Sequence, residues 1–145
     1  MKPFRLDKVL EYRRHQRLEA RNALASAISD EQTLIEHQAR INRQKGQQLS
    51  ELAGFTRSEV VNVEAAARRR YFTGQLEIQL MVVAEQLAQA RLVVEQMRAV
   101  LVKADQEVKA LERLHEKHVE EETSLEQKRT EIELSEQWQS ANWNW

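Results

Sequence analysis

Residues 75–111 read QLEIQLMVVAEQLAQARLVVEQMRAVLVKADQEVKAL and carry an apolar side chain at alternating steps of four and three. These steps are the a and d positions of a heptad repeat, which draws one apolar seam along a helix. No polar residue interrupts this seam. Such a helix needs a partner helix along its length, so the stretch predicts a rod-like interaction protein rather than an enzyme with a pocket. The seam residues are Leu76, Leu80, Val83, Leu87, Ala90, Val94, Met97, Leu101, Ala104, Val108 and Leu111.

A weaker seam with the same rhythm lies in the first half of the chain. It begins just after Pro3, a residue that is tolerated at a helix start. Several of its positions are polar, and Gly46 lies inside it, where it should weaken the helix locally. Its members are Leu6, Leu10, Arg13, Arg17, Ala20, Leu24, Ala27, Glu31, Leu34, Gln38, Ile41, Lys45, Gln48 and Leu52.

Together the two seams predict an all-α fold, a long antiparallel two-helix coiled-coil hairpin with a short helical tip. The whole chain, residues 1–145, is expected to form one coiled-coil domain. Helix one is predicted over about 4–53, the tip over about 54–74 and helix two over about 75–138, with a C-terminal tail at 139–145.

The tip is predicted from signals that end and start helices. Gly54 is the residue type that most often follows a helix end, and Thr56-Arg57-Ser58-Glu59 has the pattern of a capping box. Gly74 marks a second weak point. Closing the hairpin directly at Gly54 would instead continue the second seam backwards through poor seam residues, which favours the separate tip. Those residues are Thr73, Arg69, Ala66 and Asn62.

Two registers of the hairpin fit the seams. Folding about residue 64 places Ile41 opposite Leu87 and Leu10 opposite His118, with every a position facing a d position. A shift by one heptad fits as well, so the sequence leaves the register open. Either register leaves the C-terminus extending past the N-terminus by many residues.

Composition excludes several classes of protein. The formal net charge is −1, whereas a general nucleic-acid binder is usually basic. The chain has no cysteine, which excludes disulfides and thiolate chemistry and agrees with a cytoplasmic location. No apolar run approaches the roughly 20 residues of a membrane span, and the N-terminus has no apolar signal region. With no glycine-rich phosphate loop either, no catalytic residue, metal site or cofactor is predicted.

Two groups of side chains suggest other functions, metal binding for one and binding of nucleic acid or acidic lipid for the other. Glu112 and His115 have the Glu-x-x-His spacing of di-iron bundles, and His118 and Glu122 continue the same helical face. A two-helix hairpin cannot supply the matching ligands from two further helices, so these are interpreted as polar seam residues near the open end of the coil. Arg68-Arg69-Arg70-Tyr71-Phe72 could touch nucleic acid or acidic lipid, but a solvated face or a surface for an acidic protein is the commoner role.

The two chain ends carry opposite charges. Five basic residues near the N-terminus would lie beside acidic ones of helix two, so they either pair with these or engage a partner. All three tryptophans lie between Trp138 and Trp145, and exposed tryptophan favours interfaces, so Trp138 is interpreted as a docking residue. The basic residues are Arg5, Lys8, Arg13, Arg14 and Arg17, and the acidic ones Glu120, Glu121, Glu122 and Glu126.

The opening segment from Phe4 to Arg14, followed by Glu19-Ala20 and Leu24, resembles the start of the FliJ family of flagellar type III export proteins. Members of this family are similar to YscO-type proteins of injectisomes and to the coiled-coil part of the rotary ATPase γ subunit. The resemblance implies a cytoplasmic protein, peripherally associated with the inner face of the cell membrane at the flagellar base. It implies roles in flagellum biogenesis, protein export and motility.

The resemblance also implies partners and sites. The joined ends of the coil would enter the hexameric flagellar export ATPase, promote its assembly and activity, and link it to the export-gate membrane protein. Substrate-specific export chaperones are further implied partners. The gate-contacting patch would map to Phe72 and Leu76, with Gln38 on the facing helix. The ring-contacting residues would be Phe4, Leu6, Val9, Leu10, Tyr12, Arg13, His118, Leu125, Ile132 and Trp138.

Two other functions stay open from the residues alone. A generic coiled-coil scaffold or homo-oligomer would satisfy the long seam between chains rather than within one. A metal-dependent helical enzyme would be built on Glu112, His115 and His118. The mass of the protein in solution would test the first alternative, and metal bound after purification would test the second.

Overall fold

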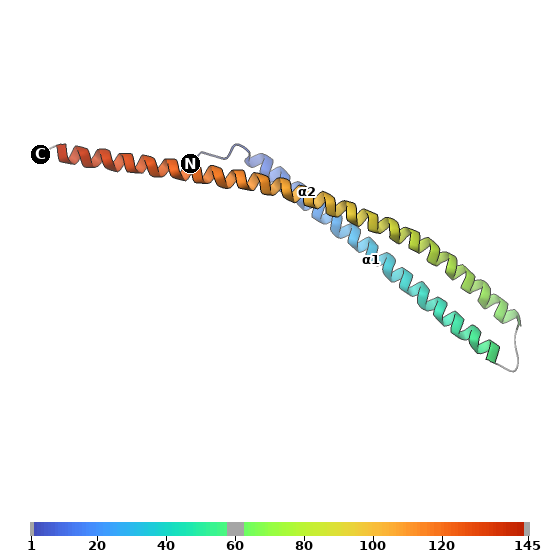
Figure 1. Cartoon of the computed structure of the whole chain (residues 1–145). Helices are drawn as coiled ribbons and strands as arrows, with labels where there is room; N and C mark the ends of the chain where they lie inside the picture. The colour runs from blue at the N-terminus through green and yellow to red at the C-terminus, as the bar shows by residue number, and fades with distance from the viewer. Residues whose placement is uncertain (1, 58–62, 144–145) are drawn as a thin grey trace. The chain divides into compact units, whose positions relative to one another are not determined.

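The computed structural model describes residues 2–57 and 63–143, which form two long helices (Figure 1). Helix α1 spans Asp7–Arg57 and helix α2 spans Val63–Trp143. The described residues include no β-strand. The predicted all-α fold is confirmed, with two long helices packed against each other as in an antiparallel hairpin. No helix in the described parts of the chain is long and apolar enough to cross a membrane.

The heptad positions predict the packed face of both helices correctly. Every seam residue of α1 and of α2 is buried or half-buried. Burying one large apolar side chain contributes about 1.5–3 kcal/mol, so a row of them can hold two helices together without a thick core. All the buried apolar residues of the described chain are seam residues: Leu10, Ala20, Ala27, Ile41, Leu76, Val83, Leu87, Val94, Ala104 and Val108.

The chain divides into two units, and in each of them α1 and α2 lie side by side and run in opposite directions. The unit formed by Arg21–Ala99 has its core where Ile41 packs with Leu76 and Val83, and Leu80 contacts this cluster. Ile41 is 2% exposed and Leu76 is 1% exposed. Two helices enclose only one line of side chains, and this cluster is part of that line.

The other unit combines Met1–Ala20 with Val100–Trp145. Leu10 and Ala20 of α1 are buried here with Ala104 and Val108 of α2. Farther along α2 the residues lose this cover. Over residues 120–142, which we call the C-terminal arm, every side chain except Glu122 is exposed. The arm forms the red end of α2 and extends past the N-terminal segment (Figure 1).

Ion pairs between the helices fix which of the two registers the chain adopts. Lys45 pairs with Glu77 in one unit and Arg17 with Asp105 in the other, and both pairs are centred on residue 61. Arg13 pairs with Glu107, centred on residue 60. The register folded about residue 64 is therefore wrong, and the alternative shifted by one heptad is the one observed. Both bring apolar seam residues together, but only the observed one places these opposite charges side by side.

The helix ends also differ from the prediction. Helix α1 continues through Gly54 to Arg57, and α2 begins at Val63 and continues through Gly74, so residues 54–57 and 63–74 belong to the two long helices. No described glycine has a positive φ. A glycine inside a helix lowers the stability of that helix by about 1 kcal/mol relative to alanine. The packing of the surrounding seam residues outweighs this cost. Ser58 and Glu59 of the expected capping box lie outside the described residues. At its other end α2 extends past residue 138 to Trp143.

The polar seam residues near Gly74 are accommodated because their polar groups have partners. Thr73 is 7% exposed, and its hydroxyl donates a hydrogen bond of 2.8 Å to the backbone carbonyl of Arg69. The Arg69 guanidinium donates to Gln48 Oε1 at 3.0 Å and pairs with Glu51. A long charged side chain can lie across a two-helix seam with its stem packed and its head paired. The seam that was expected to stop at residue 76 therefore continues to Arg69.

Candidate functional site

The first residues of the chain lie against α2 as a short strap, residues 2–6. The backbone amide of Asp7 donates to the Phe4 carbonyl at 3.1 Å, and the amide of Leu10 donates to the Leu6 carbonyl at 2.8 Å. These bonds give the first amides of α1 acceptors that a helix start otherwise lacks. The strap therefore enters α1 along one defined path, and this path brings Phe4 to α2.

Two histidines of α2 receive the Phe4 ring. The ring lies edge-on to His115, with centroids 5.2 Å apart, and tilted against His118 at 5.5 Å. His118 Nε2 is 3.0 Å from the Lys2 carbonyl oxygen, and His115 Nε2 is 3.9 Å from Asp7 Oδ1. Aromatic contacts of this kind contribute about 0.5–1.5 kcal/mol beyond the area they bury. The chain's N-terminal segment and the end of the paired coil are thus held at one place.

A shallow surface hollow lies beside this contact. It is lined by the strap together with Leu114, Lys117, His118 and Glu121 of α2. No three His, Cys, Asp or Glu side chains of the described residues are placed to hold a metal ion together. Glu112 pairs with Arg14 at 3.4 Å, while His115 and His118 contact Phe4. These three residues of α2 therefore contact the N-terminal part of the chain.

The arginines of α1 pair with acidic residues of α2 that lie earlier than expected. Arg13 Nη1 is 2.8 Å from Glu107 Oε2 and also donates to Gln16 Oε1 at 3.0 Å. Arg14 reaches Glu112. The prediction that Arg13 and Arg14 lie beside Glu120, Glu121, Glu122 and Glu126 is wrong. The observed register instead brings Glu107 and Glu112 of α2 alongside these arginines.

The Asp105 carboxylate is paired with two cations. Lys109 approaches its Oδ2 at 2.9 Å along α2, and Arg17 of α1 approaches its Oδ1 at 3.1 Å. Hydrogen bonds from Lys109 and Arg17 hold the pKa of the Asp105 carboxyl below its ordinary value. Both cations favour the ionised form, so the three side chains form a charge cluster that joins the helices.

The ring-contacting residues implied by the resemblance fall into two groups in the structure. Some are buried and hold the two helices together, and others are accessible to a partner. Leu10 is 3% exposed and holds the two helices together, so its side chain is not available to a partner. Phe4, Leu6, Arg13 and His118 are half-buried. The accessible residues are Val9 and Tyr12 on α1 and Leu125, Ile132 and Trp138 on the C-terminal arm.

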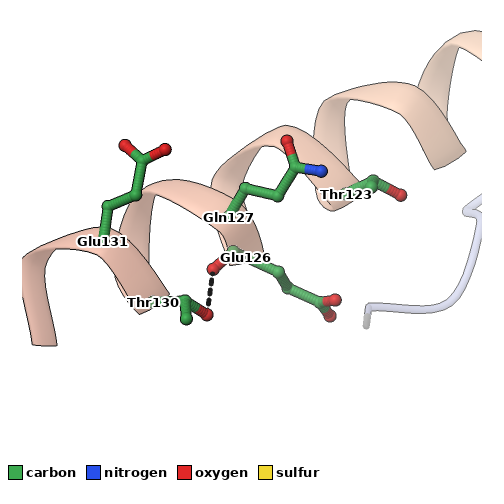
Figure 2. Close-up of a pocket in the computed structure, with 5 residues that line it drawn as sticks. All are labelled: Thr123, Glu126, Gln127, Thr130 and Glu131. Carbon is green, nitrogen blue, oxygen red and sulfur yellow. Dashed lines mark hydrogen bonds between the residues drawn. The ribbon is translucent and has the colours of Figure 1, made fainter. Parts of the chain in front are cut away.

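Figure 2 shows a stretch of the arm with its side chains directed outward around the helix. Thr123, Glu126, Gln127, Thr130 and Glu131 line a shallow concavity on this helix. The hydroxyl of Thr130 donates to the backbone carbonyl of Glu126 at 2.9 Å. The carboxylates of Glu126 and Glu131 point to different sides of the helix. The arm thus presents acidic groups on more than one face.

The patch implied for the export gate is only partly on the surface. Phe72 is exposed, and Tyr71 beside it is more so, whereas Leu76 lies in the core with Ile41. Gln38 is half-buried on α1. In the observed register Gln38 faces residues near 83, about 16 Å along the helix from Phe72. The structure therefore does not bring Gln38 and Phe72 together.

Two features of these sites escaped the sequence reasoning. The backbone carbonyl of Lys2 contacts His118. No pattern of side chains in the sequence predicts this backbone contact. Leu134 is 60% exposed on the arm. Its spacing of four residues from Trp138 places both on one helical face, and that signal was present in the sequence.

Comparison with known proteins gives one match. The family model described as Flagellar FliJ protein matches residues 1–141. No curated protein matches the chain. No solved structure matches it either. The family match covers nearly the whole chain, including the strap, both helices and almost all of the arm, and so the chain belongs to the flagellar FliJ protein family.

Proposed function

We propose that this protein is a non-enzymatic stalk of the flagellar type III export apparatus. Its joined ends bind the hexameric export ATPase and promote ring assembly and activity, and the middle of the coil couples the ring to the export-gate membrane protein. Membership of the FliJ family makes the chain a flagellar export-related protein and a non-catalytic component of that system. The partners and the contact residues are the proposal.

The contact between the strap and α2 carries the proposal. Phe4 against His115 and His118 fastens the N-terminal segment to the end of the paired coil. Val9 and Tyr12 lie exposed on α1 close to it. An ordered cluster with accessible apolar side chains suits insertion into a ring, because little conformational entropy is lost on binding.

The proposal places the protein in the cytoplasm at the inner face of the cell membrane, held there by the gate protein. The exposed pair Tyr71 and Phe72 supports a contact with the gate on the coil's middle, since exposed aromatic side chains are enriched in protein interfaces. Leu76 would support this patch from beneath. Binding of substrate chaperones belongs to the same proposal.

The test measures the ATP hydrolysis rate and the assembly of the organism's flagellar export ATPase with and without this protein. Stimulation should be lost in a Val9→Asp, Tyr12→Asp variant, because both side chains are exposed at the joined ends. Leu92→Asp is the matched control, an exposed apolar residue in the middle of α2. Equal stimulation by both variants, or none by the unmodified protein, would reject the proposal.

A further inference from the structure

The seam of α2 continues into the C-terminal arm, beyond the residues that α1 covers. Leu125 and Ile132 keep the four–three spacing and are seven residues apart, so both lie on one side of the helix. They are 48% and 58% exposed, respectively. We call this surface the seam face of the arm. A heptad seam packs against a second helix, and in the described part of the chain the seam face has none.

Acidic side chains surround the seam face. Residues 120–142 contain seven glutamates against one lysine and one arginine. Glu121 precedes Leu125 by four residues and Glu136 follows Ile132 by four, so both glutamates lie beside the apolar pair. A helix that covers the seam face therefore needs apolar residues with cationic residues beside them.

A second apolar surface without a partner lies on α2 within the unit formed by Arg21–Ala99. Tyr71, Ile78 and Val82 are 72%, 55% and 52% exposed. Ile78 and Val82 lie within about 20° of Tyr71 around the helix, whereas Leu80, which packs against the core cluster, lies about 180° away. The three exposed residues, which we call the outer face, therefore point away from α1.

The outer face carries positive charge at one end. Arg68 and Arg70 are exposed and lie on either side of Tyr71, about 60° and about 100° around the helix. Neither guanidinium has an ion-pair partner among the described residues. The one acidic residue between positions 66 and 84 is Glu77, which pairs with Lys45 at 3.4 Å. The outer face is thus an apolar surface with two unpaired cations beside it.

The seam face and the outer face complement each other. Tyr71 and Ile78 are seven residues apart, as Leu125 and Ile132 are, and helices whose apolar residues repeat at this interval can pack along each other. The charges beside the two surfaces are opposite, which favours their association. Two arms would instead bring glutamates together, and two outer faces would bring arginines together, so like charges oppose both of those pairings.

We propose that the seam face of the C-terminal arm packs against the outer face of α2 in a second copy of this chain. Two different surfaces meet, so the contact is head-to-tail and builds either a closed pair or a growing row of copies. The second copy supplies the helix that the seam lacks beyond α1, and its arginines pair with glutamates of the arm. This inference does not depend on the export role proposed above.

The test measures self-association of the purified full chain by sedimentation velocity at about 1 to 200 μM protein. The unmodified protein should associate with a dissociation constant inside this range at about 0.05 M salt, and about tenfold more weakly at about 0.5 M, because salt screens surface charge pairs. Leu125→Ser, Ile132→Ser alters the seam face, and Ile78→Ser, Val82→Ser alters the outer face. Each should weaken association about tenfold or more, as loss of interface anchors does.

Two controls change matched apolar residues outside the contact. Ile28→Ser, Leu49→Ser alters residues of α1 that are 44% and 46% exposed. Leu134→Ser, Trp138→Ser alters the arm on the side away from the seam face, since Leu134 is about 200° around the helix from Ile132. Both controls should associate like the unmodified protein.

A charge exchange tests whether the two surfaces are each other's partners. Arg68→Glu, Arg70→Glu makes the outer face acidic, and Glu133→Lys, Glu136→Lys reverses charges beside the seam face. Each variant alone should associate about tenfold more weakly at low salt, because like charges then meet. An equimolar mixture of the two should regain association, because the acidic outer face of one variant then meets the reversed arm of the other.

The results separate the alternatives. A protein that stays monomeric at every concentration overturns the inference, as does association that the seam-face and outer-face variants leave unchanged. Loss of association in the control on the other side of the arm, or in the charge control Glu11→Lys, Glu36→Lys, also overturns it. Binding of a monomeric protein to vesicles of anionic phospholipid, lost in the arginine variant, would assign the outer face to a lipid surface instead. All substituted side chains are exposed, so circular dichroism should show unchanged helix content.

Discussion

Replacing Ile41 by alanine should remove much of the stability of the unit formed by Arg21–Ala99. Ile41 is 2% exposed and packs in one cluster with Leu76, Val83 and Leu80. The substitution removes three carbon atoms, each worth about 0.8 kcal/mol of burial, or about 2.4 kcal/mol together. The remaining cavity adds to this cost unless the two helices close over it, so a loss of about 2–4 kcal/mol is expected.

The assay is urea unfolding followed by helical circular dichroism at 222 nm, with the free energy taken from the midpoint at unchanged slope. Ile28→Ala is the matched control, because Ile28 lies exposed on the same helix outside the seam. Its expected effect is within about 0.5 kcal/mol. Equal losses for the two variants would refute the reasoning, since they would show that burial in the seam does not determine stability.

The remaining predictions concern acid stability and register. Lys109 and Arg17 lower the pKa of Asp105 in the folded protein, so this carboxylate stabilises the fold above its ordinary pKa of 3.8, and that contribution is lost as the pH falls through the lowered value. Asp105→Asn should therefore make stability less dependent on pH below about 4, as acid titrations of both proteins would reveal, and identical titration curves would contradict it. The chain has no cysteine, so a protein with Ile41→Cys and Leu80→Cys should form one internal disulfide on oxidation, visible by gel mobility without reductant. A disulfide needs Cα atoms within about 7 Å, and a shift of one heptad displaces the helices by about 10 Å, so failure to cross-link would contradict the observed register.

The candidate site could be foreseen only in part. Tyr12 and Trp138 lie off the seam spacing and are accessible, as a contact role requires, whereas Ile132 continues the four–three spacing of the seam and is nevertheless exposed. Leu10 and Leu76 carry the same apolar signal, yet both are buried in the seam. An apolar residue of a coiled coil can pack against the partner helix or bind another protein, and the residue type alone does not distinguish these roles.

The contact of the strap with α2 was beyond sequence reasoning for another reason. His115 and His118 have metal-ligand spacing, and nothing in their pattern indicates that the Phe4 ring lies against them. This contact depends on which residue of α2 lies beside the chain's first turn. It is therefore a consequence of register, as are the ion pairs of Arg13 and Arg17.

The sequence by itself determined the helices and their buried face. The alternation of four and three is a local property of the chain, and every seam residue from Leu6 to Leu52 and from Leu76 to Leu111 is buried or half-buried as that alternation requires. Only the tertiary structure decided the register and the continuation of the seam through Thr73 to Arg69. A heptad pattern superimposes on itself when shifted by seven residues, so burial is satisfied equally well in either register. Charge pairs across the helices and the partners of polar seam groups depend on that shift, and they appear only when the two helices are placed together.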